Sequence, residues 1–346
     1  MNNIRFKDFL IDYLEANNIT NKDFANRLGI TPKHLIDILS GTTQLSSQLI
    51  DKISFITDIP ADYIYRIESN YNLESRIDTF LIREELSETD YLNKFDYKYL
   101  IKDNYIDITD KNDKLEIIKD ILKFLRVPSP EEIYKIDNNA YFKSKNDKPE
   151  LLLLWLEKCY RETLKQEVSE YHKENIDVLV NYISKSAKDG KYVEEELINE
   201  FNKNGIFLVI QDDIPGSKIR GAFKVHRGIP AIYLTHKHKR IADIYFALLH
   251  ELAHCKTDFN KAQATNLISY ETCDDKEEEK RDNQAFNWAV DDNYYYNICC
   301  KKDYDIEEET KFPKCFVLYR LAKDGKIKYS DSKYQKYNFL LNQKNA

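Results

Sequence analysis

The sequence contains few cysteines, and no two of them form a C-x-x-C pair. The six are Cys159, Cys255, Cys273, Cys299, Cys300 and Cys315. This spacing argues against a structural zinc ribbon, and in a cytosolic protein they are most simply reduced thiols. The chain also lacks a P-loop, a glycine-rich dinucleotide turn and a serine nucleophile elbow, so it offers no sign of nucleotide-dependent or serine-hydrolase chemistry.

Long hydrophobic runs and an excess of positive charge are also missing. No apolar stretch approaches the roughly twenty residues that span a bilayer, and the N-terminus has no signal-peptide hydrophobic segment. We therefore expect a cytoplasmic protein that does not contact a membrane. The net charge of −7 argues against a general binder of nucleic acid or membrane surfaces.

What the sequence does contain is the pentapeptide His250-Glu251-Leu252-Ala253-His254, an H-E-x-x-H motif. Residues four apart lie on one face of a helix, so His250 and His254 can bind a single metal ion. Glu251 lies between them, where it could take a proton from water. The motif is typical of zinc peptidases, and the alternative is a solvated helix with two incidental histidines.

The segment around this motif predicts a buried helix with a narrow polar notch. Apolar residues from Ile241 to Leu252 recur at i, i+3, i+4, i+7, i+8 and i+11, which gives one apolar stripe. His250, His254 and Asp243 fall on the opposite side. A solvated helix would not be flanked by so much apolar surface, so the pattern favours metal binding.

A third metal ligand is expected from a later element, because a catalytic zinc takes three protein ligands and keeps one position for water. A second helix is predicted over residues 277–290, and Asp282 lies one turn before its apolar face. We therefore predict Asp282 as the third ligand, with Glu278 and Glu279 as geometric alternatives. The other interpretation of these acidic residues is a solvated helix start.

These two segments resemble the ImmA/IrrE-type metallopeptidases, bacterial zinc-dependent peptidases that act on repressors. The family's second motif, E-x-x-A-N-x-F-A, is similar to Asp282-Asn283-Gln284-Ala285-Phe286-Asn287-Trp288-Ala289, with Asp at the ligand position and Phe286 in place of Asn. The resemblance covers about Leu151 to Tyr337. It implies Zn²⁺ held by His250, His254 and Asp282, with Glu251 as the catalytic base.

Strand-like segments precede the predicted metal helix. Gly205–Ile210 is an apolar run, and Arg220–Val225 and Pro230–Leu234 predict a hairpin that turns at residues 226–228. In the resembling family such strands form a small sheet beside the metal helix, and the Gly221-Ala222 pair is similar to one of its features. An exposed sheet edge could hold an extended polypeptide by main-chain pairing. With the resemblance, this predicts site-limited cleavage of a helix-turn-helix repressor.

The N-terminal residues predict a separate domain. Asn21–Leu28 and Thr31–Gly41 have the pattern of two helices, for which Gly29 permits the turn and Thr31 and Pro32 suit the start of the second helix. This resembles the Cro/repressor-like (XRE) helix-turn-helix family. The expected interior consists of Ala25, Leu28, Leu35, Ile36 and Leu39, and further helices are expected near Ser46–Thr57 and Ala61–Asn70.

In such folds the second helix enters the major groove, so Thr31, Lys33 and His34 are the predicted DNA contacts. The charge of residues 1–72 is unfavourable, with seven basic against nine acidic side chains, because DNA affinity depends on neutralising phosphates. The alternative is a helix-turn-helix domain that serves protein contact or dimerisation. A homodimer is therefore one of the possible assemblies.

The whole sequence predicts an α+β protein: an all-helical helix-turn-helix domain at 1–72, a helical linker at 73–150, and a zincin-like metallopeptidase domain at 151–346 with a small sheet beside the metal helix. The predicted function is a zinc-dependent endopeptidase that regulates gene expression. One alternative is a DNA-binding regulator or antitoxin-like protein whose peptidase-like domain only senses or interacts. Another is a structural metal protein, although such a site has no need of a base like Glu251.

Overall fold

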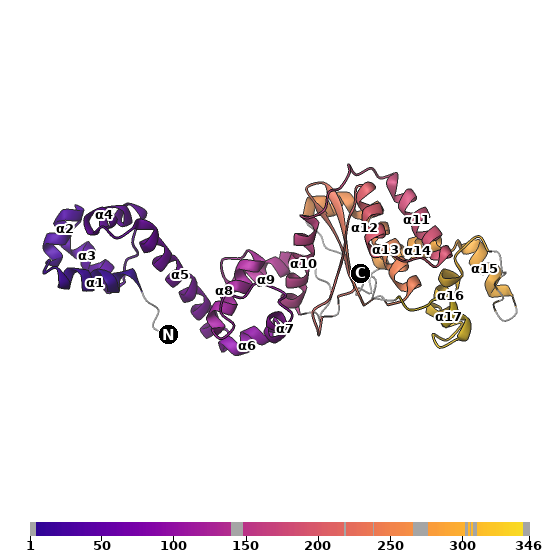
Figure 1. Ribbon diagram of the computed structural model, residues 1–346, viewed down its shortest axis with the longest axis horizontal. Coiled ribbons are helices and arrows are strands. Elements are labelled where there is room, and N and C mark those ends of the chain that lie inside the picture. The colour runs from indigo at the N-terminus through magenta and orange to yellow at the C-terminus, as the bar shows by residue number, and fades with distance from the viewer. Residues whose placement is uncertain are drawn as a thin grey trace. The chain divides into compact units, whose positions relative to one another are not determined.

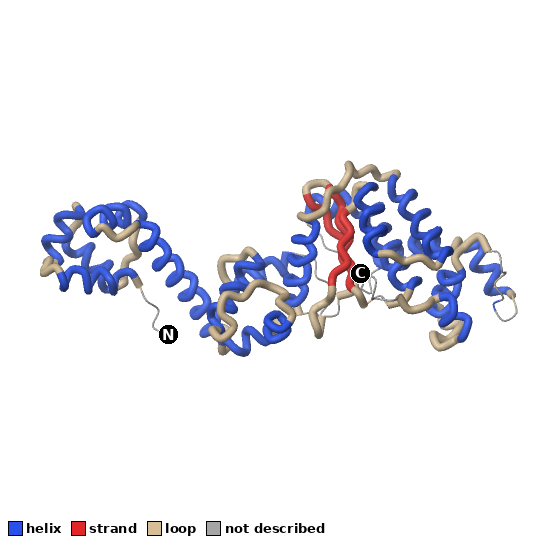
Figure 2. The backbone as a smooth tube through the Cα atoms, viewed as in Figure 1, coloured by secondary structure: helices blue, strands red, loops and turns tan. Residues whose placement is uncertain are grey.

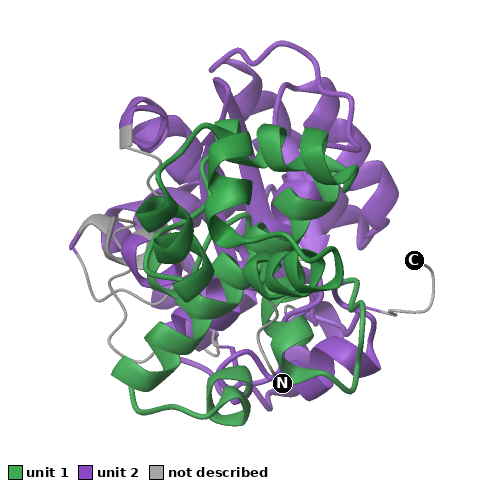
Figure 3. Ribbon diagram, turned by 90° about the vertical axis from the view of Figure 1, so that its left-hand side faces the viewer, with its two compact units in different colours: residues 1–92, 107–132 green, residues 93–106, 133–346 purple. Residues whose placement is uncertain are grey.

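The structure is a computed structural model that describes residues 5–139, 148–217, 219–237, 239–265, 276–301, 304, 306 and 310–341. The chain divides into two compact units: unit 1 is Met1–Leu92 with Asp107–Glu132, and unit 2 is Asn93–Ile106 with Ile133–Ala346 (Figure 3). Residues 140–147 of the predicted linker and Cys273 lie outside the described residues. Over the described ranges, no helix combines the length and the apolar character needed to cross a membrane.

Helices make up most of both units, and one small sheet lies in unit 2 (Figures 1 and 2). The helices are α1 (Phe6–Ala16), α2 (Asn21–Leu28), α3 (Pro32–Ser40), α4 (Ser47–Thr57), α5 (Ala61–Arg83), α6 (Glu88–Asn93), α7 (Tyr97–Lys102), α8 (Lys114–Leu125), α9 (Pro130–Asn139), α10 (Pro149–Thr163), α11 (Asn175–Asp189), α12 (Glu194–Lys203), α13 (Ile241–Thr265), α14 (Lys276–Ala289), α15 (Asp292–Cys300), α16 (Lys314–Lys323) and α17 (Ser332–Tyr337). The strands are β1 (Phe207–Gln211), β2 (Gly221–His226) and β3 (Ile229–Thr235).

The N-terminal helix pair forms as the sequence predicts. Gly29 ends α2 in the left-handed conformation with φ of 70°, which a residue without Cβ adopts at little cost. The Thr31 hydroxyl accepts a hydrogen bond from the backbone N–H of His34 at 3.2 Å, and Pro32 occupies the first turn of α3. Cap and proline together fix where α3 begins.

Two details of this region differ from the prediction. Ile36 is 52% exposed, whereas Ile38 is buried beside Leu35, because a rotation of about 100° per residue puts Leu35 and Ile38 on one face and Ile36 to the side. Helix α5 continues to Arg83, beyond the predicted end at Asn70, since no glycine or proline interrupts it.

The sheet has the order β1-β3-β2, with β1 parallel and β2 antiparallel to β3. Arg227 and Gly228 connect β2 to β3 with φ of 52° and 83°, the positive values of a two-residue hairpin turn. The predicted hairpin is thus confirmed. Helix α13 packs on β2 and β3 and also contacts α11, α14 and α16, so it forms the centre of the unit 2 core.

Candidate metal centre

The H-E-x-x-H motif lies near the middle of α13, and α14 packs beside it. The predicted apolar stripe of α13 is buried from Ile241 to Leu252, with exposed fractions of 0 to 2%. Burial of this stripe fixes the rotation of the helix, so His250 and His254 face α14. Both imidazoles are buried, at 3% and 1% exposed.

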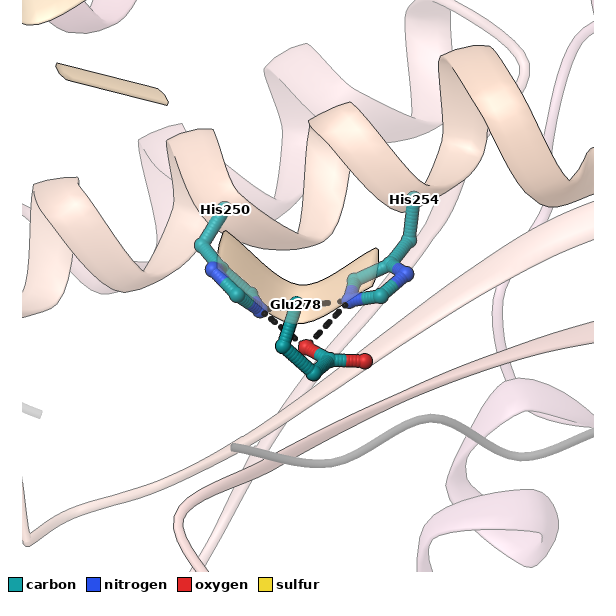
Figure 4. A group of neighbouring side chains, drawn as sticks. All are labelled: His250, His254 and Glu278. Atoms are coloured by element: carbon teal, nitrogen blue, oxygen red, sulfur yellow. Dashed lines mark hydrogen bonds and ion pairs between the residues drawn. The ribbon is translucent and has the colours of Figure 1, made fainter. Parts of the chain in front are cut away.

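Three potential metal ligands converge between the two helices: His250 and His254 from α13, and Glu278 from α14 (Figure 4). The Nε2 atoms of the two histidines lie 3.1 Å apart. The Oε2 atom of Glu278 lies 3.2 Å from Nε2 of His254 and 3.3 Å from Nε2 of His250. The three atoms therefore form a nearly equilateral triangle.

This triangle fits a zinc ion. Ligands at about 2.0–2.1 Å from a tetrahedral zinc lie roughly 3.3 Å from one another, which agrees with the distances between His250, His254 and Glu278. Two imidazole nitrogens and one carboxylate oxygen are also a donor set that zinc takes in catalytic sites. The residues present thus fit the group that the motif implies.

The outer nitrogen of each imidazole meets a carboxylate. Nδ1 of His250 lies 2.8 Å from Oδ1 of Asp282, and Nδ1 of His254 lies 2.7 Å from Oδ2 of Asp258. An ionised carboxylate can only accept a hydrogen bond, so in each neutral imidazole Nδ1 carries the proton and donates the hydrogen bond. The lone pair of the ring is then on Nε2. Both Nε2 lone pairs then face Glu278, an arrangement that a cation between them stabilises.

An arginine holds one of these two carboxylates, that of Asp258, in place. Arg281 on α14 donates from Nη2 to Oδ1 of Asp258 at 2.6 Å and from Nε to Oδ2 at 3.1 Å. Burial raises the pKa of Asp258, but its hydrogen bonds with His254 and Arg281 lower it to about 2. A bidentate pair of this kind fixes the orientation of the carboxylate, and through it the ring of His254.

The electrostatics of the site favour positive charge at the imidazoles. Burial alone lowers the pKa of His250, but hydrogen bonds with Asp282 and Glu278 raise it to about 10. Burial raises the pKa of Glu278, but its hydrogen bonds with His250 and His254 hold that pKa well below its usual range. The site therefore attracts a proton or a metal cation to the same position.

Glu251 lies beside strand β2. Its side chain is buried, at 1% exposed, and its Oε1 atom would be 2.9 Å from a Cβ added at Gly221. Gly221 begins β2, so the absence of a side chain there allows the carboxylate to approach the strand. This gives a physical reason for glycine at a position that the sequence singled out.

A cleft of about 760 Å³ opens beside the centre and is lined by His250, Glu278 and Asp282. Asp243, predicted to share their side of α13, lines it too. One edge of β2 pairs with β3, and its other edge pairs with no strand in the described part of the chain. The cleft and this edge leave room for an extended ligand near the metal position.

The structure places the carboxylates of α14 differently from the prediction that Asp282 is the third ligand. Asp282, the predicted third ligand, lies on the Nδ1 side of His250, away from the triangle. Glu278, one of the two alternatives, completes the triangle, and Glu279 is exposed and outside it. The geometry therefore favours Glu278, because its longer side chain reaches the Nε2 atoms from one turn earlier.

Asp258 contacts His254, and Arg281 contacts Asp258, and neither Asp258 nor Arg281 is among the residues that the sequence predicts. Asp258 follows His254 by four residues, so it lies on the same helical face, and that spacing was an available signal. The position of Arg281 opposite Asp258 depends on how α14 packs on α13, and no spacing in the sequence indicates it.

The predicted DNA contacts lie at the start of α3. Thr31 and Lys33 are exposed and His34 is half-buried. The Thr31 hydroxyl is engaged as the helix cap, which leaves its methyl group and the side chains of Lys33 and His34 at the surface. Asp37, one turn later, adds a negative charge to the same helix.

Comparison with known proteins bears on the N-terminal part of the chain. Residues 10–64 match the family model described as Helix-turn-helix. The match covers α2, α3 and α4 and parts of α1 and α5, so this part of unit 1 is a helix-turn-helix domain. Neither a curated protein nor a solved structure matches the chain.

Proposed function

We propose that this protein is a DNA-binding transcription regulator. The observation that supports this best is the helix-turn-helix match of residues 10–64, whose helices α2 and α3 are joined through residues 29–31. Helix α3 would enter the major groove, with Thr31, Lys33 and His34 at its leading end. Because residues 1–72 carry a small net negative charge, we expect modest affinity that depends strongly on salt.

Fluorescence anisotropy tests this proposal. It would measure binding to DNA upstream of the protein's own gene at two salt concentrations. Lys33→Gln should weaken binding several-fold and reduce the salt dependence by about one counterion. The matched control is Lys123→Gln, an exposed lysine of α8 outside the helix-turn-helix domain. Binding that is tight and equal in both variants would contradict the predicted contact.

We further propose that unit 2 is a zinc-dependent peptidase centre. The observation that favours this is the triangle of His250, His254 and Glu278 with Glu251 on the same helix. A purely structural metal site is usually closed by four protein ligands, whereas three converge here among the described residues. The open cleft beside them supports access by a substrate.

Each residue has a distinct role in this proposal. His250, His254 and Glu278 would hold Zn²⁺, and the outer carboxylates Asp282 and Asp258 would fix the imidazole rings. When bound, zinc would supply Lewis acidity toward a peptide carbonyl and toward water. The Glu251 carboxylate would take a proton from water and deliver it to the leaving amine.

The substrate we propose is an extended segment of a helix-turn-helix repressor. The free edge of β2 offers main-chain groups that pair with an extended polypeptide, and the resemblance to the ImmA/IrrE-type peptidases indicates a repressor. The helix-turn-helix domain would recruit a related partner or a shared operator. Cleavage would then be limited to few sites.

Two measurements test the peptidase proposal. The first is the zinc content of the purified protein, and the second is cleavage of repressors encoded nearby after incubation with the protein. Wild-type protein should bind about one zinc per chain and cleave one candidate, whereas Glu251→Gln should keep its zinc and lose cleavage. Cleavage that persists in Glu251→Gln would refute the role of this carboxylate. Bound zinc that changes DNA affinity, without any cleavage, would favour a sensing role for unit 2.

A further inference from the structure

A second cavity in unit 2 lies apart from the metal centre. Its volume is about 550 Å³, and residues of α11, α16 and α17 line it. Helix α16 contacts both α11 and α17, so the cavity lies within one packed group of helices. It shares no lining residue with the cleft at His250. Neither DNA binding nor peptide hydrolysis accounts for it.

The floor of this cavity is buried and mainly apolar. Ala187, Phe312 and Cys315 line it and are at most 9% exposed. Two ring carbons of Phe339 would lie 3.5 and 3.6 Å from a Cβ added at Gly190, so glycine at position 190 leaves the aromatic wall uncovered. Such a floor can bury the apolar body of a small molecule.

The rim of the cavity is positively charged. Lys188, Lys314 and Lys336 line it, and none of its described lining residues is an aspartate or a glutamate. None of the three lysines has a carboxylate partner in the described part of the chain. The ammonium groups of Lys314 and Lys336 lie 5.1 and 5.2 Å from the ring centroid of Tyr337, which restricts both to the neighbourhood of one ring.

This concentration of charge is unusual for the chain. Acidic residues outnumber basic ones, 59 to 52, so a cavity whose described lining holds three lysines and no acidic residue is not expected from composition. Phosphodiesters of DNA would use the lysines but would gain nothing from a buried apolar floor. A small molecule with an acidic group and an apolar body would use both.

We propose that this cavity binds a small organic anion, with its acidic group at Lys188, Lys314 and Lys336 and its apolar or aromatic body against Phe312 and Phe339. The site would give the regulator a ligand-binding function separate from its metal centre. Affinity would combine burial of the apolar body with charge-assisted hydrogen bonds.

Fluorescence titration of the full-length protein with 1-anilinonaphthalene-8-sulfonate tests the proposal, followed by displacement with decanoate and with the uncharged decan-1-ol. We expect saturable probe binding, and displacement by decanoate at a concentration about tenfold lower than by decan-1-ol. Raising the salt concentration should weaken decanoate binding, because the lysines are partly screened.

The decisive variant is Lys188→Gln/Lys314→Gln/Lys336→Gln, compared with Lys203→Gln/Lys326→Gln/Lys328→Gln. The control removes the same charge from exposed lysines that do not line the cavity. The first variant should bind decanoate about tenfold more weakly or worse, and the control should bind as the wild type does. Equal binding by both variants, or no saturable binding by the wild type, would overturn the proposal. Thermal unfolding of both variants shows whether they keep the fold. The salt dependence of decanoate binding by the wild type tests the contribution of charge without any substitution.

Discussion

At the scale of single residues, the proposed metal centre depends on which side of each imidazole a carboxylate occupies. Glu278 faces Nε2 of both histidines, whereas Asp282 faces Nδ1 of His250. A carboxylate on the Nε2 side can bind the metal directly. One on the Nδ1 side can only orient the ring and increase its basicity, so the two residues differ in role although both are acidic and lie on one helix.

We therefore expect the two carboxylates to contribute unequally to zinc affinity. Glu278→Ala should abolish stoichiometric zinc binding, because it removes a ligand, whereas Asp282→Asn should weaken it by about 10- to 100-fold, as loss of an outer partner does. Competition with a zinc-binding dye measures both. Exposed Glu279→Ala should behave as the wild type, and zinc retained by Glu278→Ala but lost by Asp282→Asn would restore the original assignment of the third ligand.

Gly221 supports a prediction about packing around Glu251. A Cβ at position 221 would lie 2.9 Å from both Glu251 Oε1 and Leu234 Cδ2, so Gly221→Ala should destabilise the protein by about 1–3 kcal/mol. Removing the Glu251 carboxylate should relieve part of this destabilisation. In a Glu251→Ala background the destabilisation by Gly221→Ala, measured by urea unfolding, should therefore be smaller, and strict additivity would count against the contact.

At the scale of helices and strands, local signals in the sequence were sufficient for much of the fold. The caps at Gly29 and Thr31, the hairpin around Arg227 and the periodicity of α13 each depend on neighbouring residues, and all appear in the structure. The choice between Glu278 and Asp282 was different. Both lie on one face of α14, and only the approach of α14 to α13 decides which meets the Nε2 atoms.

A contact between the sheet and α12 supports a prediction about pH. His236 follows β3, and its Nε2 and Nδ1 atoms lie 3.1 Å from Glu194 and 2.7 Å from Asp212. The hydrogen bond with Glu194, reinforced by Asp212 and opposed by burial, raises the pKa of His236 to about 9. Since the folded pKa exceeds the unfolded value, this contribution to stability is complete below about pH 6.5 and is lost as the pH rises through 9.

His236→Gln should consequently destabilise the protein most at low pH. We expect a loss on the order of 1 kcal/mol at pH 6, after allowance for partial solvent screening, and almost none near pH 10. Urea unfolding at several pH values measures the difference from the wild type. His172→Gln, at a histidine whose side chain is 59% exposed, is the matched control, and a loss at His236 that does not vary with pH would contradict this account.

At the scale of the whole molecule, the interior of the helix-turn-helix domain and the core around α13 are separate clusters of buried residues. The helix-turn-helix interior is formed by residues of α1 to α5, from Phe6 to Ile64, and the metal helix lies in a different core that begins at Ile176. The three residues of the proposed metal centre come from α13 and α14, both within unit 2. If the proposed zinc binds there, a change in its occupancy would act directly on the stability of unit 2.

We accordingly expect removal of zinc by a chelator to lower the unfolding temperature of unit 2 and to leave that of the helix-turn-helix domain unchanged. Zinc at a thousandfold excess over its Kd would stabilise unit 2 by about 4 kcal/mol, because it binds the folded state alone. Differential scanning calorimetry of the full chain, with and without chelator, measures the shift. In His254→Ala the chelator should have no effect, since one ligand is gone. A chelator effect that persists in this variant, or that moves both transitions equally, would place the bound metal elsewhere.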